Sequence, residues 1–531
     1  PRVLLSYLVE NIEDQSDTNT IPISFILLGR AADCLGVMLL DEPDLDFFQR
    51  IQNLLIRYLN DKNQSNYILG LVSEDVIKFI RIFCCKKNEG IDYWEGIYYV
   101  LLDILNSNND ILICESLKII NNCLCYLEIG KDDLNNIFMN FIVDDQKFEN
   151  AFVSTVKLLF NVYRMTKDNQ EITLQLKNFI VSVMEKIPSL SQSCCENLLY
   201  EFTMIDELSL TLFDNILINV IELMKNIIFN ENSTFRMKSS SLYFLKSIFC
   251  SSYCFNLTEN AIDFCKKLTD LLEVSDYSIN PDDDLFNDKS LFSIITDFLS
   301  DVSLKYGGNL DFANEFGCLL LSQLKETPKK SLYAALGSTI QSMSDIIQYG
   351  DSFSDYEEVF MLGFRSNDIY VRHAALCSFQ NLVESLYDRT KNNYTNDIIG
   401  TLLNNLSNET DINMILKTFS TLETYCNRFS DVLIKYVNEL TEFLYHILME
   451  ESPSVFQEYA IKIYSICAEA IGVNFSNYLK QIYPFVEKVY MDLGNNYDRS
   501  LFFECIHALP SFYHCIPQEK FESHTIMIFE L

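Results

Sequence analysis

The chain has 531 residues, and its 74 acidic residues against 40 Lys and Arg give a formal net charge of −34. This acid excess argues against direct binding to nucleic acid, whose phosphates need Lys and Arg, and disfavours an anionic membrane surface, so a basic protein partner or solubility alone remains. With only 15 Gly and 10 Pro, a sheet-rich fold with many tight turns is excluded, while 49% hydrophobic residues can supply a long core.

A short apolar pattern recurs from the N-terminus onward, and each copy predicts one helix because apolar residues follow three and then six or seven positions later. The copies lie at Ala31-Ala32, Val76-Ile77, Ser116-Leu117, Thr155-Val156, Leu198-Leu199, Ser241-Leu242, Leu291, Tyr333-Ala334, Ala375-Leu376, Thr418-Phe419, Ala460-Ile461 and Cys505-Ile506. Their spacing of about 43 residues is typical of two-helix HEAT or armadillo units.

A second apolar helix is predicted between successive copies, for example over 353–364, 431–448 and 475–489. Each unit is then an A helix, a turn and a B helix, and neither helix can bury its apolar stripe alone. The sequence therefore predicts an all-α HEAT-repeat superhelical solenoid, an α-α superhelix of about twelve helix pairs. It spans 1–531 as a single array, with A helices outside and B helices inside.

The start of one B helix, DIYVRHAAL, shows how a unit begins. Asp368 stands where a carboxylate can cap the helix N-terminus, and Val371 is placed to fill the gap between repeats. Arg372 is expected to pair with an acid of a neighbouring unit, as a rung of a structural repeat ladder; the alternative is a solvated side chain. His373 is expected to be a surface or groove residue rather than a ligand.

The longest interval between copies holds an acidic segment, 274–290, with the sequence VSDYSINPDDDLFNDKS. Pro281 and the Asp cluster stop a helix, so the segment is predicted to be an acidic loop inserted within the array. Its acidic residues are Asp276, Asp282, Asp283, Asp284 and Asp288. The alternative is an insertion without a role, because lengthening a loop costs little.

Motifs for chemistry are not found. The five His accompany no nucleophile or HExxH motif, and neither a phosphate-binding loop nor a dinucleotide fingerprint is present. The 17 Cys lack CxxC spacing and are expected to be small core residues in a reducing compartment. We therefore predict no enzyme and no catalytic, cofactor-binding or metal-binding residues, and no apolar run reaches the ~20 residues of a membrane span.

The order of several segments resembles the importin-β (karyopherin-β) family, nearest its importin β-3 branch. The matching segments are Tyr93-Trp94-Glu95-Gly96, Arg236 with Leu242 and Leu245, the acidic loop followed by SLFSIITDFLSDVSLKYGGN, Asp368–Leu382, and SLFFECIHALPSFYHCIPQEKF at 500–521. One departure is Thr327-Pro328-Lys329, where the family has a Trp. Because the chain starts at Pro1 and the family continues for many more repeats, an N-terminal and central portion of a receptor is expected.

The resemblance implies a nuclear import receptor that shuttles between cytoplasm and nucleus. Its acidic inner groove would bind basic cargo such as ribosomal proteins or histones, Ran-GTP would release that cargo, and Phe-Gly nucleoporins would bind between outer helices. The acidic loop, Asp276 to Asp288, would take part in cargo and Ran handling. Two alternatives stay open: a structural HEAT-repeat scaffold, of phosphatase or chromosome-complex type, and a nuclear export receptor.

Overall fold

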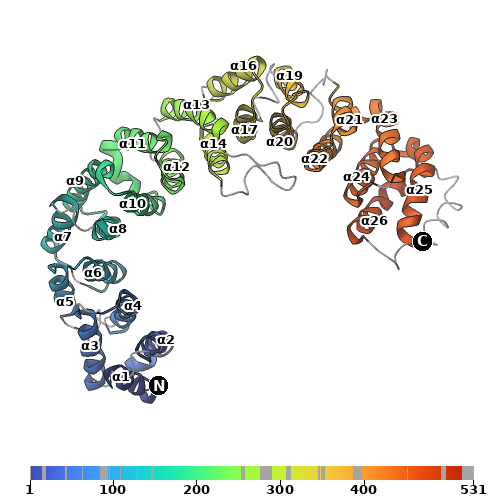
Figure 1. The fold of residues 1–531 in the computed structure, drawn as a ribbon. Coiled ribbons are helices and arrows are strands. Elements are labelled where there is room, and N and C mark those ends of the chain that lie inside the picture. The colour runs from blue at the N-terminus through green and yellow to red at the C-terminus, as the bar shows by residue number, and fades with distance from the viewer. Residues whose placement is uncertain are drawn as a thin grey trace. The chain divides into compact units, whose positions relative to one another are not determined.

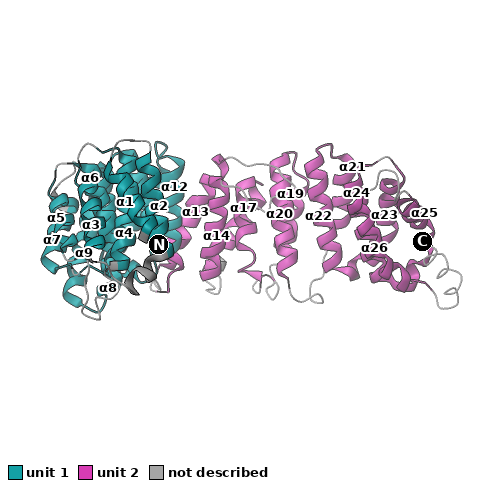
Figure 2. Cartoon of the chain, turned by 90° about the horizontal axis from the view of Figure 1, so that it is seen from below, with its two compact units in different colours: residues 1–247 teal, residues 248–531 magenta. Residues whose placement is uncertain are grey.

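The computed structural model of the chain is a succession of helices (Figure 1). It describes residues 2–14, 20–41, 45–61, 64–83, 94, 96–107, 109–127, 129–144, 149–252, 257–275, 290–306, 312–344, 347, 353–386, 397–450, 452–491 and 498–516. Within these ranges no β-strand occurs. The helices fall into two compact units, Pro1–Ser247 and Ile248–Leu531 (Figure 2).

In unit 1, A and B helices alternate along the chain and form two layers, with successive B helices packed side by side. The A layer consists of α1 (Arg2–Asp14), α3 (Leu45–Leu59), α5 (Ile97–Leu105), α7 (Lys131–Phe138) with η2 (Met139–Asp144), α9 (Gln170–Lys186) with η3 (Ile187–Ser189), and η4 (Ser209–Ile216) with α11 (Leu217–Phe229). The B layer consists of α2 (Thr20–Asp41), α4 (Asn66–Phe83), α6 (Asp110–Cys123), α8 (Glu149–Thr166), α10 (Gln192–Thr203) and α12 (Phe235–Cys250).

Unit 2 repeats this arrangement. Its A layer consists of α13 (Thr258–Val274), η5 (Ala313–Gly317) with α16 (Cys318–Glu326), α19 (Phe353–Phe364), α21 (Ile398–Asn408), α23 (Ser430–Met449), and η6 (Gly472–Phe475) with α25 (Ser476–Met491). Its B layer consists of α14 (Leu291–Tyr306), α17 (Lys330–Thr339), α20 (Ile369–Ser385), α22 (Ile412–Arg428), α24 (Ser454–Ile471) and α26 (Arg499–His514).

Side-chain caps begin many of the B helices. Asn109, Ser191, Asp368, Asp411 and Asp498 each accept hydrogen bonds from backbone N–H groups of the first turn. These groups have no partner inside the helix, so each cap satisfies a donor that would otherwise face only water. The caps explain why a polar residue precedes each apolar run in the sequence.

Aromatic rings connect successive B helices in the core of unit 1. The ring of Phe202 on α10 lies 5.0 Å from that of Phe244 on α12 and 6.0 Å from those of Phe160 on α8 and Phe213 in η4. Phe202, Phe213 and Phe244 are fully buried. One ring therefore ties three B helices and an A-layer segment together.

Small residues let helices approach closely in the core of unit 2. A Cβ on Gly363 of α19 would lie 2.5 Å from the Cβ of Ala375 and 2.6 Å from the ring of Tyr333, so no larger side chain fits there. The hydroxyl of Tyr333 donates to the Val359 carbonyl at 2.6 Å. The small residues in the VRHAAL segment are thus required by packing.

The all-α fold of repeated helix pairs is confirmed, and the described residues contain twelve A/B pairs, as predicted. The A helices expected over 353–364, 431–448 and 475–489 are α19, α23 and α25. Several A-layer segments are not plain α-helices, since η2 and η5 are π-helical and η4 is a 3-10 helix. A single array over 1–531 stays a prediction, and the acidic loop residues Asp276, Asp282, Asp283, Asp284 and Asp288 lie outside the described residues.

Candidate functional site

Acidic side chains recur on the solvent-facing side of the B helices of unit 2, which we call the B face of unit 2. They are half-buried or exposed and come from five helices: Asp297, Asp301, Glu384, Glu423, Glu458, Glu469 and Glu504. The B helices pack side by side, so these carboxylates lie along one surface. A series of carboxylates attracts a basic segment more strongly than a single carboxylate does.

Two of these carboxylates act on one lysine across three helices. Lys462 on α24 lies 3.6 Å from Glu504 on α26, and its charge also attracts that of Glu423 on α22. Burial raises the pKa of Glu423, Lys462 lowers it and Glu504 raises it, and the net shift is upward. A second cation placed here would favour the ionised form of Glu423.

Aromatic surface adjoins this charged group. Tyr459 of α24 stacks on Phe419 of α22, with ring centroids 5.6 Å apart and planes 9° from parallel. The Lys462 ammonium lies 5.4 Å from the centroid of the Tyr459 ring. Tyr459 is only half-buried, so the B face of unit 2 offers a ring face beside its carboxylates.

Two further acids hold neighbouring B helices together. The Ser500 hydroxyl donates to Glu458 at 2.9 Å, and the Ser511 hydroxyl donates to Glu469 at 2.6 Å, in each case from α26 to α24. Each of these hydrogen bonds uses one oxygen of the carboxylate. The second oxygen can still accept a hydrogen bond from another donor. These residues therefore position α26 and still present negative charge to solvent.

Asp368 and Arg372 both make side-chain contacts at the start of α20. Asp368 accepts from the backbone N–H of Tyr370 and of Val371, and it caps α20. Arg372 donates to Glu409 at 2.6 Å, which lies between α21 and α22 in the next pair. Burial alone would raise the pKa of Glu409, but the hydrogen bonds from Arg372 and the backbone hold it below its usual value.

An Arg–Asp ladder along the whole array stays a prediction. Near the start of other B helices, the contact to the neighbouring repeat uses different groups. In unit 1, the backbone N–H of Ser191 donates to Glu149 at 2.9 Å, and the Thr234 hydroxyl donates to Glu196 at 2.7 Å. A polar contact between neighbouring repeats is therefore present in each of these cases, but the residues that form it differ.

His373 was expected at the surface, and this was wrong. Its side chain is 1% exposed, and its Nδ1 lies 3.8 Å from the Sγ of Cys377 one turn later, itself buried. Most of α20 between Val371 and Val383 is buried, so His373 lies in the core, which the sequence pattern alone did not reveal.

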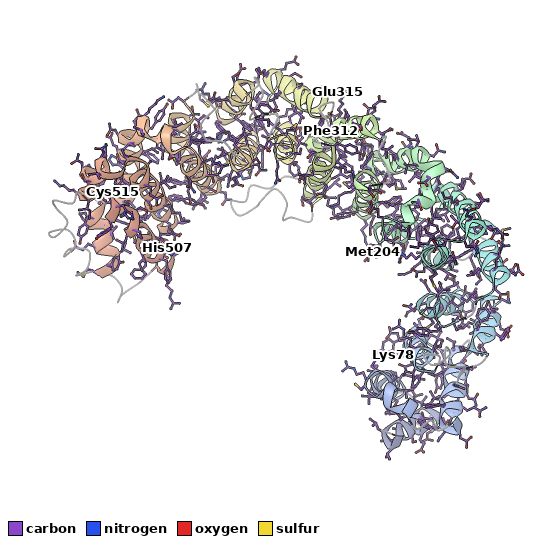
Figure 3. All side chains as sticks on the ribbon, turned by 180° about the vertical axis from the view of Figure 1, so that it is seen from behind. Lys78, Met204, Phe312, Glu315, His507 and Cys515 are labelled. Atoms are coloured by element: carbon purple, nitrogen blue, oxygen red, sulfur yellow. The ribbon has the colours of Figure 1, made fainter. Side chains whose placement is uncertain are left out.

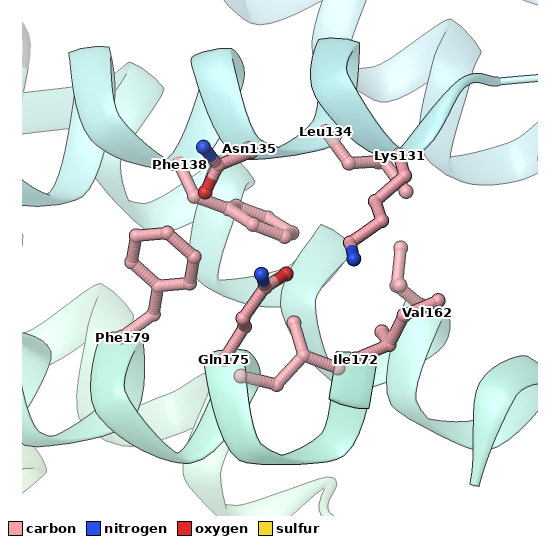
Figure 4. A pocket seen from close by; sticks show the side chains of 9 residues that line it. Lys131, Leu134, Asn135, Phe138, Val162, Ile172, Gln175 and Phe179 are labelled. Carbon is pink, nitrogen blue, oxygen red and sulfur yellow. The ribbon is translucent and has the colours of Figure 1, made fainter. Parts of the chain in front are cut away.

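A narrow apolar pocket lies between two neighbouring A helices of unit 1 (Figure 4). Its volume is about 20 Å³, and the rings of Phe138 on α7 and Phe179 on α9 lie 5.1 Å apart beside it. Lys131 and Glu171 form an ion pair near its rim. The pocket holds a water-sized group as it stands, so a larger apolar group requires the two rings to part.

A buried carboxyl between α2 and α4 was missed by sequence reasoning. Asp75 is 3% exposed, and its Oδ2 has no hydrogen-bond partner within the described ranges. It packs against Gly29, where a Cβ would lie 2.1 Å from Asp75 Oδ1. Burial raises the pKa of Asp75 to about 8, although Lys78 opposes this shift. The sequence analysis assigned Val76-Ile77 to the repeat but gave no role to the acid that precedes them.

Asp75→Asn is expected to stabilise unit 1 by about 2–4 kcal/mol at pH 8.5 and much less at pH 5. The native carboxyl stays protonated up to about pH 8, whereas the unfolded one ionises near its usual value. Stability from this group is therefore present at low pH and is lost as pH rises toward 8. Thermal unfolding at both pH values checks this, with the exposed Asp103→Asn as control; equal shifts for the two variants would contradict it.

Among the residues that the structure describes, no group of three or more His, Cys, Asp or Glu is placed to hold a metal ion. No helix in the described part is long and apolar enough to cross a membrane.

No model of a known protein family matches the sequence, and no curated protein matches it. Solved structures do match: the karyopherin Kap121p alone, bound to Pho4p, and bound to Nup53p, each with a TM-score of 0.80, 15% identity and coverage of 99% of this chain. The chain spans about half the length of those structures, since it covers 51% of each. At this identity the likeness establishes the fold, a karyopherin-type solenoid of helix pairs.

Proposed function

We propose that this chain is part of an importin-β-type nuclear import receptor of the β-3 branch, which binds basic protein cargo on the B face of unit 2. The observation that carries the proposal is the recurrence of carboxylates on four successive B helices, α20, α22, α24 and α26, within a karyopherin fold. Kap121p has been solved bound to Pho4p, to Ste12p, to Ulp1p and to the extreme C-terminus of Cdc14p, so a protein segment is a reasonable ligand for this fold. The receptor would act without enzymatic chemistry and shuttle between cytoplasm and nucleus.

Charge supports a basic ligand. From α20 to α26 the carboxylates of the B face of unit 2 repeat from helix to helix, at the ~8–10 Å that separates packed helices. Cations spaced along an extended segment can meet them in turn, and the ring of Tyr459 can pack against the aliphatic part of a Lys or Arg. Ribosomal proteins and histones are rich in such segments, which makes them the proposed cargo.

Release by Ran-GTP and passage through the pore complete the proposal. Ran-GTP would bind the receptor and lower its affinity for cargo, and the acidic loop, Asp276 to Asp288, would contribute to that exchange. One Kap121p structure holds Nup53p, so nucleoporins are proposed as the second class of partner. The pocket between α7 and α9 is the proposed site for a Phe side chain of a Phe-Gly repeat.

Asn135→Trp is expected to weaken binding of a Phe-Gly peptide about five-fold, because the indole covers the pocket mouth and one blocked apolar contact costs about 1 kcal/mol. Asn135 lines the pocket and is exposed, so the core is untouched. Asn136→Trp is the matched control, because Asn136 is the next residue along the chain and is also exposed, but it does not line the pocket. Peptide binding measured on immobilised protein checks this, and an equal loss in both variants would count against the pocket.

The test of the proposed function is capture of Ran loaded with GTP or GDP, with and without a Lys/Arg-rich peptide. An import receptor binds Ran-GTP in preference to Ran-GDP and then loses the peptide. An export receptor would bind peptide and Ran-GTP together. A structural scaffold would bind neither form of Ran, and that result would overturn the proposal.

A further inference from the structure

Lys462 on α24 lies between acids of the two neighbouring B helices of unit 2. Its Nζ is 3.6 Å from Glu504 Oε1 on α26, and its charge also attracts that of Glu423 on α22. The same Nζ lies 5.4 Å from the centroid of the Tyr459 ring, within reach of a cation–π interaction. We call Glu423, Glu504 and Tyr459 the cation subsite, which the lysine of the chain itself occupies.

The other acids on the B face of α20 to α26 contact neutral side chains in the part of the chain that the structure describes. Glu384 accepts from Gln380 at 3.1 Å, and two acids of α24 accept from serines of α26. Lys417 on α22 is 8% exposed, and it donates to the amide oxygen of Gln380 at 3.0 Å. Lys462 is therefore the lysine of these helices that lies against acids proposed to bind basic cargo.

The contacts of Lys462 are weak enough to be exchanged. A charge-assisted hydrogen bond is ~2.7–2.9 Å long, and the separation of 3.6 Å from Glu504 exceeds this. The side chains of Lys462 and Glu504 are 33% and 26% exposed, and ion pairs in contact with solvent add little stability. Figure 3 shows His507, one turn after Glu504 on α26, on the side of the B layer that faces solvent. A cation from solvent can therefore take the place of the Lys462 ammonium.

One lysine does not fully compensate the two carboxylates. Burial raises the pKa of Glu423 and Glu504 raises it further, although Lys462 opposes both effects. While Lys462 occupies the subsite, its ammonium offsets one carboxylate charge and repels any second cation. Without Lys462, a cation from another molecule would gain the attraction of both carboxylates and the face of the Tyr459 ring.

We propose that Glu423, Glu504 and Tyr459 bind one Lys or Arg side chain of the cargo, and that Lys462 holds this subsite as an intramolecular competitor until the cargo cation displaces it. The inference rests on the proposed function, because it concerns the surface to which basic cargo is proposed to bind. Lys462 has a flexible stem of four carbons, so its ammonium can move into solvent without any change in the backbone of α24. The competitor sets how tightly the free receptor binds a basic segment.

The test replaces Lys462 and measures the affinity of the full chain for a fluorescent Lys/Arg-rich peptide by anisotropy. Lys462→Met removes the charge and keeps an unbranched side chain, whereas Lys462→Arg keeps the charge. The matched control is Lys325→Met on the A helix α16, because the Lys325 side chain is 36% exposed and lies 2.6 Å from Asp355 and 3.0 Å from Glu358. Far-UV circular dichroism checks that all variants are folded.

We expect Lys462→Met to bind the peptide roughly five-fold more tightly than the unsubstituted chain, and Lys462→Arg and Lys325→Met to bind it with unchanged affinity. The gain is expected to disappear when Lys462→Met is combined with Glu504→Gln, because the freed carboxylate is then absent. A residue that only holds α24 to α26 would not produce a gain on its removal.

The proposal is overturned if Lys462→Met binds the peptide equally well or more weakly, or if Lys325→Met gains as much. The same peptide is titrated against Glu384→Lys/Glu469→Lys/Glu504→Lys. If that variant loses affinity while Lys462→Met shows no gain, the competitor is refuted and the basic-cargo site stands. If neither variant differs from the unsubstituted chain, the basic-cargo site fails as well.

Discussion

Reversal of three acids on the B face of unit 2, Glu384→Lys/Glu469→Lys/Glu504→Lys, is expected to lower affinity for a Lys/Arg-rich peptide about 100-fold or more. Each reversal removes an attraction and adds a repulsion at a site the peptide must cross. The loss is expected to shrink at high salt, because the Debye length falls from ~10 Å at 0.1 M to ~3 Å at 1 M. Peptide titration at the two salt concentrations measures both effects.

The matched control changes the net charge by the same amount elsewhere. Glu439, Glu442 and Glu487 are exposed on the A helices α23 and α25, so Glu439→Lys/Glu442→Lys/Glu487→Lys keeps the B face intact. A loss of similar size in the control would mean that the overall charge of −34, and not the B face, attracts the peptide.

Phe202→Ala is expected to destabilise unit 1 by about 3–5 kcal/mol, because it opens a cavity among rings from three B helices. Each helix pair contacts only its neighbours, so the loss concentrates in α8, α10 and α12. Hydrogen exchange of peptides from these helices, together with urea unfolding, measures the loss.

Tyr200→Ala provides the control for Phe202→Ala, because Tyr200 lies on the same helix with its side chain 53% exposed. It is expected to change stability by less than about 1 kcal/mol. If Phe202→Ala unfolds at the same urea concentration as Tyr200→Ala, the ring cluster does not hold the repeats together.

The repeating fold was predictable from sequence because the apolar stripe of each B helix recurs with a constant period. The cap at Asp368 and the pairing of Arg372 were predictable for the same reason, since both belong to the start of a repeated element. The π-helical and 3-10 segments of the A layer were not, because an inserted or tightened turn leaves the apolar pattern nearly unchanged.

Contacts between repeats were the part that sequence reasoning missed. The burial of Asp75 involves Gly29 in another helix, and His373 is buried although its place in the sequence predicted a surface position.

Hydrogen exchange of the full chain with and without a bound Lys/Arg-rich peptide tests the central claim most directly. The account predicts slower exchange in α20, α22, α24 and α26, where the B face carries Glu384, Glu423, Glu469 and Glu504, and little change in the A layer. Peptide binding with protection confined to the A helices, or to unit 1, would contradict it.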